Sequence, residues 1–216
     1  MRGRVPYKVF LQEVLPYVPD CPELVAIAAI RDACIEFCEK SHFLRAKLEC
    51  DDIEAGEAEY PLPRCEGYDI IMVLAAWYKG RTLRVTTIDQ LNARYGTDWR
   101  GYRGAPVYFV QDRPDTIIFS PTPDKSEEKA WFVEVALKPT RNSTGVDMRV
   151  YERFADVIGY GARAKIHEIP NQPYSDPQAA IRFRTWFDSG CTNARIMTNK
   201  GVGRAGHRVR PRTFGV

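Results

Sequence analysis

The sequence lacks the short motifs that mark common enzymes and metal proteins. It contains no Gly-x-Ser-x-Gly elbow, no phosphate-binding P-loop, no dinucleotide fingerprint and no His-Glu-x-x-His pair. Its three histidines, His42, His167 and His207, are scattered and offer no pair of metal ligands at a useful spacing. These absences favour a structural or binding protein, and we expect no catalytic residue, no cofactor and no bound metal.

Long apolar runs are also missing. No segment approaches the roughly 20 apolar residues that a membrane-spanning helix needs. The basic N-terminal segment has neither the continuous apolar stretch nor the small-residue cleavage site of a signal peptide. We therefore expect no membrane partner and a chain that stays in the cytosol of the cell that makes it.

The cysteines show no Cys-x-x-Cys spacing that would indicate a zinc or redox site. Cys34 and Cys38 lie four residues apart and would share one face of a helix. In a cytosolic protein we interpret such residues as reduced thiols that fill the core. A Cys–His nucleophile stays open as a minor alternative, without local support. The six residues are Cys21, Cys34, Cys38, Cys50, Cys65 and Cys191.

Three carboxylates on successive turns of one expected helix could in principle do acid–base work. These are Asp32, Glu36 and Glu39. Arg31 and Lys40 stand close to them in the sequence, so we favour a solvated helix face or intrahelical ion pairs.

Helical periodicity dominates both ends of the chain, where apolar residues recur every three or four positions. Asp20 and Glu23 form an expected capping box, and Asp176 is an expected N-cap. Gly159 and Gly161 lie inside an expected helix and indicate close approach by another helix, or a break. The expected helices cover 7–14, 22–41, 148–169 and 178–200.

Alternating and apolar runs fill the middle of the chain. Lys79-Gly80 is the expected turn of one hairpin, and a short helix with Thr87 as its cap separates it from the next. Residues 141–147 are interpreted as a loop. The expected strands lie within 45–50, 56–63, 68–85, 107–110, 116–119 and 129–140.

This order of elements predicts an α+β fold. We expect a helical bundle built from 1–43 and 141–200, with an antiparallel β-rich unit at 44–140 inserted between its two parts. Residues 201–216 would follow as an extended basic arm.

Charge is distributed unevenly along the chain. Residues 195–216 hold six Lys or Arg and no Asp or Glu, whereas the rest holds 25 Lys or Arg and 28 Asp or Glu. A mildly acidic body with a basic arm predicts an anionic binding surface for the arm, either nucleic acid or an acidic groove of a protein.

A second candidate surface is the loop that spans 94–106. It is rich in Gly, Arg and aromatic residues and too polar to be buried whole, which favours contact with a partner, a protein ahead of a nucleic acid. The candidate contact residues are Arg94, Trp99, Arg100, Tyr102 and Arg103.

Read together, these segments resemble the head–tail adaptor (connector) proteins of tailed bacteriophages, especially short-tailed ones. The resemblance begins with the opening FLQEVLPYVPDCPELVAIAAIRDACIEFCEKS. It continues in order through AGEAEYPLP, WYKGRTL, IIFSPTP, VEVALKPT and YERFADVIGYGARAKIHEIP, and so covers nearly the whole chain.

The resemblance implies a structural virion protein at the head–tail junction, assembled in the cytoplasm of the host bacterium. Copies would form a ring, commonly dodecameric, under the portal protein, with the helical part toward the portal and a tail nozzle or tube protein on the other side. Packaged DNA would pass through the ring without specific binding. The C-terminal arm would dock on the portal through Arg204, Arg208, Val209, Arg210, Arg212 and Phe214.

The alternative hypothesis is a nucleic-acid-binding protein whose basic arm neutralises phosphates. Its affinity for DNA would fall steeply as salt rises, because each phosphate contact releases counterions.

Overall fold

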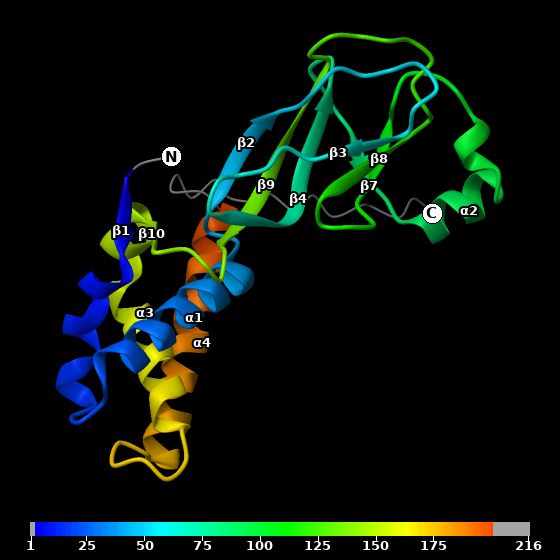
Figure 1. Cartoon of the computed structure of the whole chain (residues 1–216). Helices are drawn as coiled ribbons and strands as arrows, with labels where there is room; N and C mark the ends of the chain where they lie inside the picture. Colours follow the sequence, from blue (N-terminus) through cyan, green and yellow to red (C-terminus); the bar gives the residue numbers. More distant parts are fainter. Residues whose placement is uncertain (1–2, 201–216) are drawn as a thin grey trace.

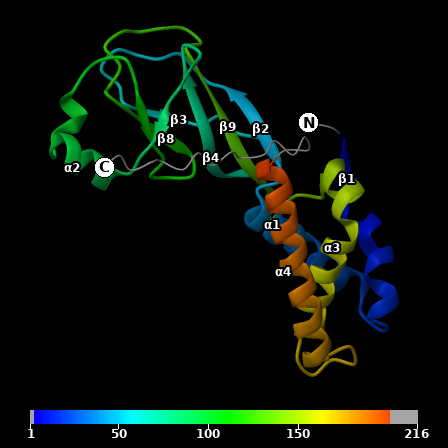
Figure 2. The ribbon, with the colours of Figure 1, turned by 180° about the vertical axis from the view of Figure 1, so that it is seen from behind.

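The computed structural model describes residues 3–200, which fold into two lobes (Figure 1). Three long helices lie side by side in one lobe, and Figure 2 shows the same arrangement from behind. They are α1 (Glu23–Ser41), α3 (Met148–His167) and α4 (Pro177–Lys200). The other lobe contains the strands between Arg45 and Pro139. The predicted α+β fold is therefore confirmed, and helices from both ends of the chain share one lobe.

Helix α1 matches its predicted range within one residue, but its start differs from the prediction. It begins directly after Pro22, whose fixed backbone angle suits a helix N-terminus, and no side chain caps it. Asp20 adopts a positive φ of 65°, which turns it away from the capping position. The expected capping box between Asp20 and Glu23 is therefore wrong. His42 ends the helix in the left-handed conformation.

The segment before α1 is wound into two short 3-10 helices, η1 (Tyr7–Glu13) and η2 (Leu15–Tyr17). The helical segment expected at 7–14 is present, but a second helical turn, η2, follows it and includes Pro16. Phe10 and Val14 are fully buried, so this segment covers one side of the helical lobe.

Helices α3 and α4 pack closely because α3 carries glycine at the contact. A Cβ added to Gly161 would lie 2.7 Å from ring carbons of Phe187 on α4. We predicted that Gly159 and Gly161 mark either close approach by another helix or a break. For Gly161 the structure shows close approach by a helix. Asp176 is the N-cap of α4 as predicted, since its Oδ1 accepts hydrogen bonds from the backbone N–H groups of Gln178 and Ala179, each at 3.0 Å.

The strand lobe contains two four-stranded sheets, with strand orders β2-β9-β4-β5 and β3-β8-β7-β6. Both predicted hairpins are present, and Lys79-Gly80 forms the turn of the first with positive φ at both residues. The β6–β7 pair is parallel, which departs from the expected antiparallel unit. The strands are β2 (Arg45–Glu49), β3 (Glu59–Pro61), β4 (Tyr68–Tyr78), β5 (Arg81–Thr82), β6 (Arg84–Val85), β7 (Tyr108–Val110), β8 (Thr116–Ser120) and β9 (Trp131–Pro139).

Aromatic side chains join the two sheets. Tyr60 on β3, Phe119 on β8 and Trp131 on β9 contact one another with ring centres 5.0–5.7 Å apart. All three are buried, so they form the core between the sheets.

A third sheet was not expected from the sequence. Strands β1 (Arg4–Pro6) and β10 (Gly145–Asp147) pair in antiparallel register beside the helical lobe. The interpretation of 141–147 wholly as a loop is therefore wrong for its last three residues. A Cβ at Gly145 would lie 2.3 Å from the carbonyl oxygen of Val5, so only glycine allows this close pairing.

One continuous cluster of buried side chains runs through both lobes, from Phe10 and Ile30 to Phe119 and Val133. The expected division of the chain into two domains, a helical bundle of 1–43 with 141–200 and a β-rich unit of 44–140, stays a prediction. Within residues 3–200, no helix has the length and apolar character to span a membrane.

Candidate functional site

The loop expected at 94–106 begins later than predicted, because Arg94 and Tyr95 still belong to helix α2 (Ile88–Tyr95). The remainder contains a short 3-10 helix, η3 (Trp99–Gly101). Thr87 caps α2 as predicted, with its hydroxyl accepting a hydrogen bond from the N–H of Gln90. A hydrogen bond holds this loop to the segment that follows β8, because the hydroxyl of Thr122 donates to the carbonyl oxygen of Arg100 at 2.9 Å.

The structure separates Trp99 from the other four candidate residues of this loop. Its indole is 1% exposed and packs with Leu91, Val110 and Ile118. Trp99 thus anchors the loop from inside and does not present its ring to a partner. Its burial could not be inferred from the sequence, because an irregular loop has no periodicity to assign an inner face.

The remaining candidates, Arg94, Arg100, Tyr102 and Arg103, are exposed. Tyr102 is 56% exposed and lies against Tyr95 with ring centres 5.8 Å apart. Arg94 donates a hydrogen bond to the hydroxyl of Tyr108, and the guanidinium of Arg100 lies 4.5 Å from the ring centre of Trp99. Arg94, Arg100 and Tyr102 each lie beside an aromatic ring, whereas the guanidinium of Arg103 lies near Gly56. We call the exposed surface formed by Arg94, Arg100, Tyr102 and Arg103 the α2 platform.

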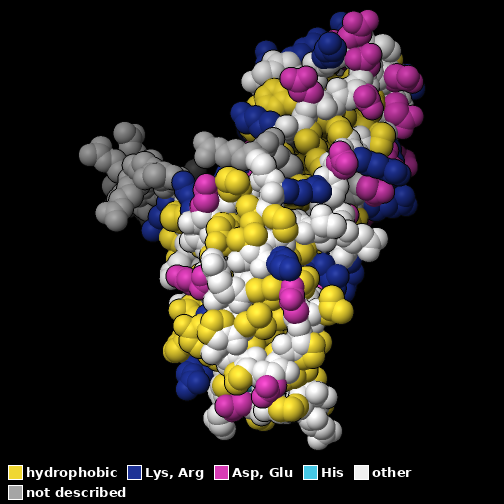
Figure 3. Space-filling view, turned by 60° about the vertical axis from the view of Figure 1, so that its left-hand side comes forward, with side chains coloured by type: hydrophobic (Ala, Val, Ile, Leu, Met, Phe, Trp, Pro, Cys, Tyr) yellow, Lys and Arg dark blue, Asp and Glu magenta, His cyan; other side chains and the backbone are white. Residues whose placement is uncertain are grey.

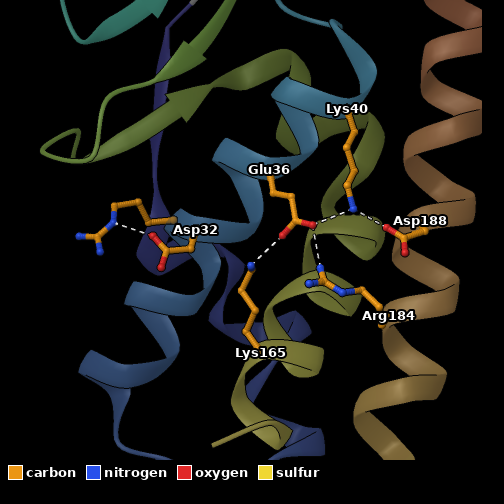
Figure 4. Close-up of polar contacts among 7 residues, drawn as sticks. Asp32, Glu36, Lys40, Lys165, Arg184 and Asp188 are labelled. Carbon is orange, nitrogen blue, oxygen red and sulfur yellow. Dashed lines mark hydrogen bonds and ion pairs between the residues drawn. The ribbon is translucent and has the colours of Figure 1, made fainter. Parts of the chain in front are cut away.

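The carboxylates of α1 form ion pairs and no catalytic pair. Glu36 accepts hydrogen bonds from Lys40 one turn later, from Lys165 on α3 and from Arg184 on α4, each at 2.7 Å (Figure 4). Lys40 also contacts Asp188 at 2.6 Å. The predicted intrahelical pairing is confirmed for Glu36, and the sequence missed its partners on the other two helices.

Burial acts to raise the pKa of Glu36, but the hydrogen bonds from Lys165, Lys40 and Arg184 outweigh it and lower this pKa to about 2. The carboxylate is therefore ionised at neutral pH and cannot serve as a general base that cycles near pH 7. It joins the three long helices.

The cysteine thiols are also unsuited to catalysis. All six are free, and five of them are buried. Burial raises the pKa of Cys50 and of Cys191 to about 12, and it raises the pKa of Cys34 well above its usual range. These thiols stay protonated at neutral pH, as the interpretation of core-filling cysteines requires.

His167 is buried, and its Nδ1 lies 2.8 Å from the carbonyl oxygen of Tyr174. His207 lies outside the described residues. Across residues 3–200, no group of three or more His, Cys, Asp or Glu side chains is placed to hold a metal ion.

A cleft in the helical lobe contains a cation that the sequence did not single out. Its volume is about 700 Å³, and we call it the Arg163 cleft. The guanidinium carbon of Arg163 lies 3.9 Å from the ring centre of Tyr17 and 5.0 Å from those of Tyr160 and Phe183. The cleft is lined by Glu13, Tyr17, Asp156, Tyr160, Arg163, Arg182, Phe183 and Trp186.

Apolar side chains are exposed over the helical lobe. On the face in Figure 3, hydrophobic side chains gather over the lower, helical part, and Asp and Glu gather toward the far end of the strand lobe. Leu24 is 81% exposed, and Ile181 on α4 is 63% exposed. Exposed apolar residues of this size are typical of surfaces that contact other proteins.

The arm residues predicted to bind the portal lie outside the described residues. They are Arg204, Arg208, Val209, Arg210, Arg212 and Phe214. Their charge is established by the sequence, and their contacts stay a prediction.

Comparison with known proteins gives one family. The family model described as SU10 adaptor protein matches residues 6–209, which include both lobes. A search of curated proteins finds no match.

Proposed function

Because the chain belongs to the SU10 adaptor protein family, a family of phage head–tail adaptors, we propose that it forms a ring beneath the portal and carries the tail. The observation that carries this proposal is the family match over 6–209, which spans the helical lobe, the strand lobe and part of the arm. The function is structural, and we propose no catalytic step for it.

The two lobes suit contact on two sides of such a ring. We assign the helical lobe to the portal side and to neighbouring copies, since its surface exposes large apolar side chains such as Leu24 and Ile181. We assign the α2 platform to the tail-side protein or a neighbouring copy, since it presents exposed arginines and Tyr102 from a fixed backbone.

The arm is proposed to dock on the portal. It carries four arginines and no acidic residue between 201 and 216. Arginine pairs with carboxylates through two parallel hydrogen bonds, and Val209 and Phe214 add apolar anchor points. Each arm alone would bind modestly, but a ring presents many arms at once, and avidity then strengthens the assembly.

Electron microscopy of the protein mixed with purified portal tests the proposal. A second ring should stack coaxially on the portal ring. A chain ending at Lys200 should keep its fold but dock weakly, and a chain with Arg204, Arg208, Arg210 and Arg212 changed to Gln should behave like it. If docking of both variants is unchanged, the arm does not bind the portal. If the full chain adds no density to the portal, the adaptor proposal itself fails.

The basic arm also suits the alternative function of nucleic-acid binding. Affinity for duplex DNA at rising salt distinguishes the two. An adaptor should bind DNA weakly and without sequence preference, because packaged DNA must slide through the ring. Tight binding that depends on the four arm arginines would favour the alternative.

A further inference from the structure

Arg163 is almost wholly buried but lines an open cleft. The residue is 4% exposed, and its Nε is fully enclosed without a hydrogen-bond acceptor, whereas its two terminal nitrogens are not fully enclosed. Among the described residues, Arg163 donates no hydrogen bond and forms no ion pair. A guanidinium has five N–H donors, and an unpaired charge with little access to water is costly, so an acceptor that enters the cleft would be favoured.

The surroundings of Arg163 already hold it in one position. Tyr17, Tyr160 and Phe183 pack around the guanidinium, which fixes its plane through cation–π contacts. Aromatic faces attract the charge, but they accept none of its N–H bonds. The cleft is therefore preorganised for a ligand and incomplete without one.

We propose that the Arg163 cleft is a docking site for a single carboxylate, which a segment of a second protein carries beside an apolar or aromatic side chain. The carboxylate would pair with Arg163, with the exposed Arg182 at the same cleft as a second cation. The apolar neighbour would pack on Trp186 and Tyr17, which are 46% and 55% exposed.

The charges that line the cleft favour one carboxylate over a phosphate or a run of acids. Glu13 and Asp156 line the same space, and neither lies within ion-pair distance of Arg163. These two carboxylates offset the charges of Arg163 and Arg182, so each negative charge that a ligand adds is less favourable than the one before. A group with one charge is therefore favoured over a dianionic phosphate. The aromatic rings likewise favour a segment of protein over the backbone of duplex DNA, which offers no apolar group at the phosphates.

We place the carboxylate on another protein. The acids of this chain that line the cleft, Glu13 and Asp156, form no ion pair with Arg163, and residues 201–216 contain no Asp or Glu. This inference rests on the proposed function only in that an adaptor packs against other proteins of the particle.

The test uses the full chain and a small probe, N-acetylphenylalanine, with the uncharged N-acetylphenylalaninamide as its matched control. The NMR signals of the Arg163 Nε–H group and the Trp186 indole N–H report binding at the cleft. We expect the acid to bind at least about tenfold more tightly than the amide, because a hydrogen-bonded charge pair is lost in the amide. Equal binding of the two probes would overturn the proposal.

Variants assign the effect to the cleft. Arg163→Gln should abolish the preference for the acid, whereas Arg153→Gln, at an exposed position of the same helix, should keep it. If Arg163→Gln does not fold, Trp186→Ala replaces it. Trp186 is exposed, so this change should leave the fold intact. It should weaken binding of N-acetylphenylalanine severalfold, and the Arg163 signal can still report that binding.

Two further outcomes would also overturn the proposal. A duplex oligonucleotide that shifts the Arg163 signal would identify the ligand as DNA. A chain ending at Lys200 that binds the acid much more tightly than the full chain would identify the part of this chain after Lys200 as the occupant. The probe measurements contain no portal, so they are independent of the ring experiment. The probe can fail to bind while coaxial rings form, and the rings can fail to form while the probe binds.

Discussion

Changing Glu36 to Gln should destabilise the protein at neutral pH in a way that disappears in acid. Glu36 is the common acceptor for Lys40, Lys165 and Arg184, which come from three different helices (Figure 4). Its side chain is 18% exposed, so its partners have limited access to water as a substitute. Glutamine keeps the size of the side chain and removes its charge.

The magnitude follows from the pKa of Glu36, which falls from an ordinary 4.5 to about 2 in the folded protein. A difference of this size corresponds to at most about 3 kcal/mol in the free energy of unfolding, at about 1.4 kcal/mol for each pKa unit. Lys40 and Arg184 are 41% and 35% exposed, so water screens part of the interaction. We therefore expect Glu36→Gln to cost about 2 kcal/mol at pH 7.

The pH dependence has a defined sign. A carboxyl whose pKa is lowered by folding stabilises the folded state above its unfolded pKa, and this contribution is lost as pH falls through its folded pKa. The difference between wild type and Glu36→Gln should be constant from about pH 7 to pH 5.5, and it should shrink below about pH 4.5. Below about pH 2 both side chains are neutral and the difference should vanish.

Urea unfolding followed by tryptophan fluorescence, repeated at several pH values, measures this difference. Glu39→Gln is the matched control on the same helix. Glu39 is 43% exposed and, within residues 3–200, pairs only with Lys138, so its loss should cost a few tenths of a kcal/mol. A Glu36→Gln effect that is as small as the control, or that persists unchanged at pH 3, would refute the reasoning.

Three other changes test the packing of the chain. Gly161→Ala should destabilise by about 1–3 kcal/mol in urea unfolding, because its Cβ would lie 2.7 Å from Phe187; an unchanged midpoint would contradict the close α3–α4 contact. Trp99→Ala should cost about 3–5 kcal/mol by the same assay, whereas Tyr102→Ala should change stability by less than about 0.5 kcal/mol. Equal effects of these two would show that Trp99 is not the anchor of the α2 platform. Cys65, the half-buried thiol, should react first with a thiol reagent, and the other five should react only when urea unfolds the protein.

Local patterns in the sequence predicted the long helices and the hairpins well. The helix expected at 22–41 occurs at Glu23–Ser41, and Thr87, Asp176 and the Lys79-Gly80 turn act as predicted. Each of these features depends on residues within a few positions of one another, so the information lies in a short window of sequence.

What the sequence did not reveal depends on contacts between distant segments. Strands β1 and β10 are three residues each, too short to show a recognisable alternation, and they pair Arg4 with the distant Asp147. Asp20 had the right spacing for a cap, but a positive φ removed it from the helix end. The partners of Glu36 on α3 and α4 became apparent only when the helices were placed side by side.

Helix α3 places two neighbouring cations in opposite situations, and this contrast gives a final prediction. Lys165 points to Glu36 and is paired, whereas Arg163 faces the aromatic rings of the Arg163 cleft without a carboxylate. If Arg163 mainly stabilised the fold, replacing it with an apolar side chain of similar length should lower the free energy of unfolding. If Arg163 is instead an unpaired charge kept for a ligand, it lowers stability itself, and a well-packed apolar replacement is often neutral or stabilising. Arg163→Met should therefore keep the free energy of unfolding within about 1 kcal/mol of wild type while it abolishes the preference for N-acetylphenylalanine. A large loss of stability without a change in probe binding would instead assign Arg163 to the core of the helical lobe.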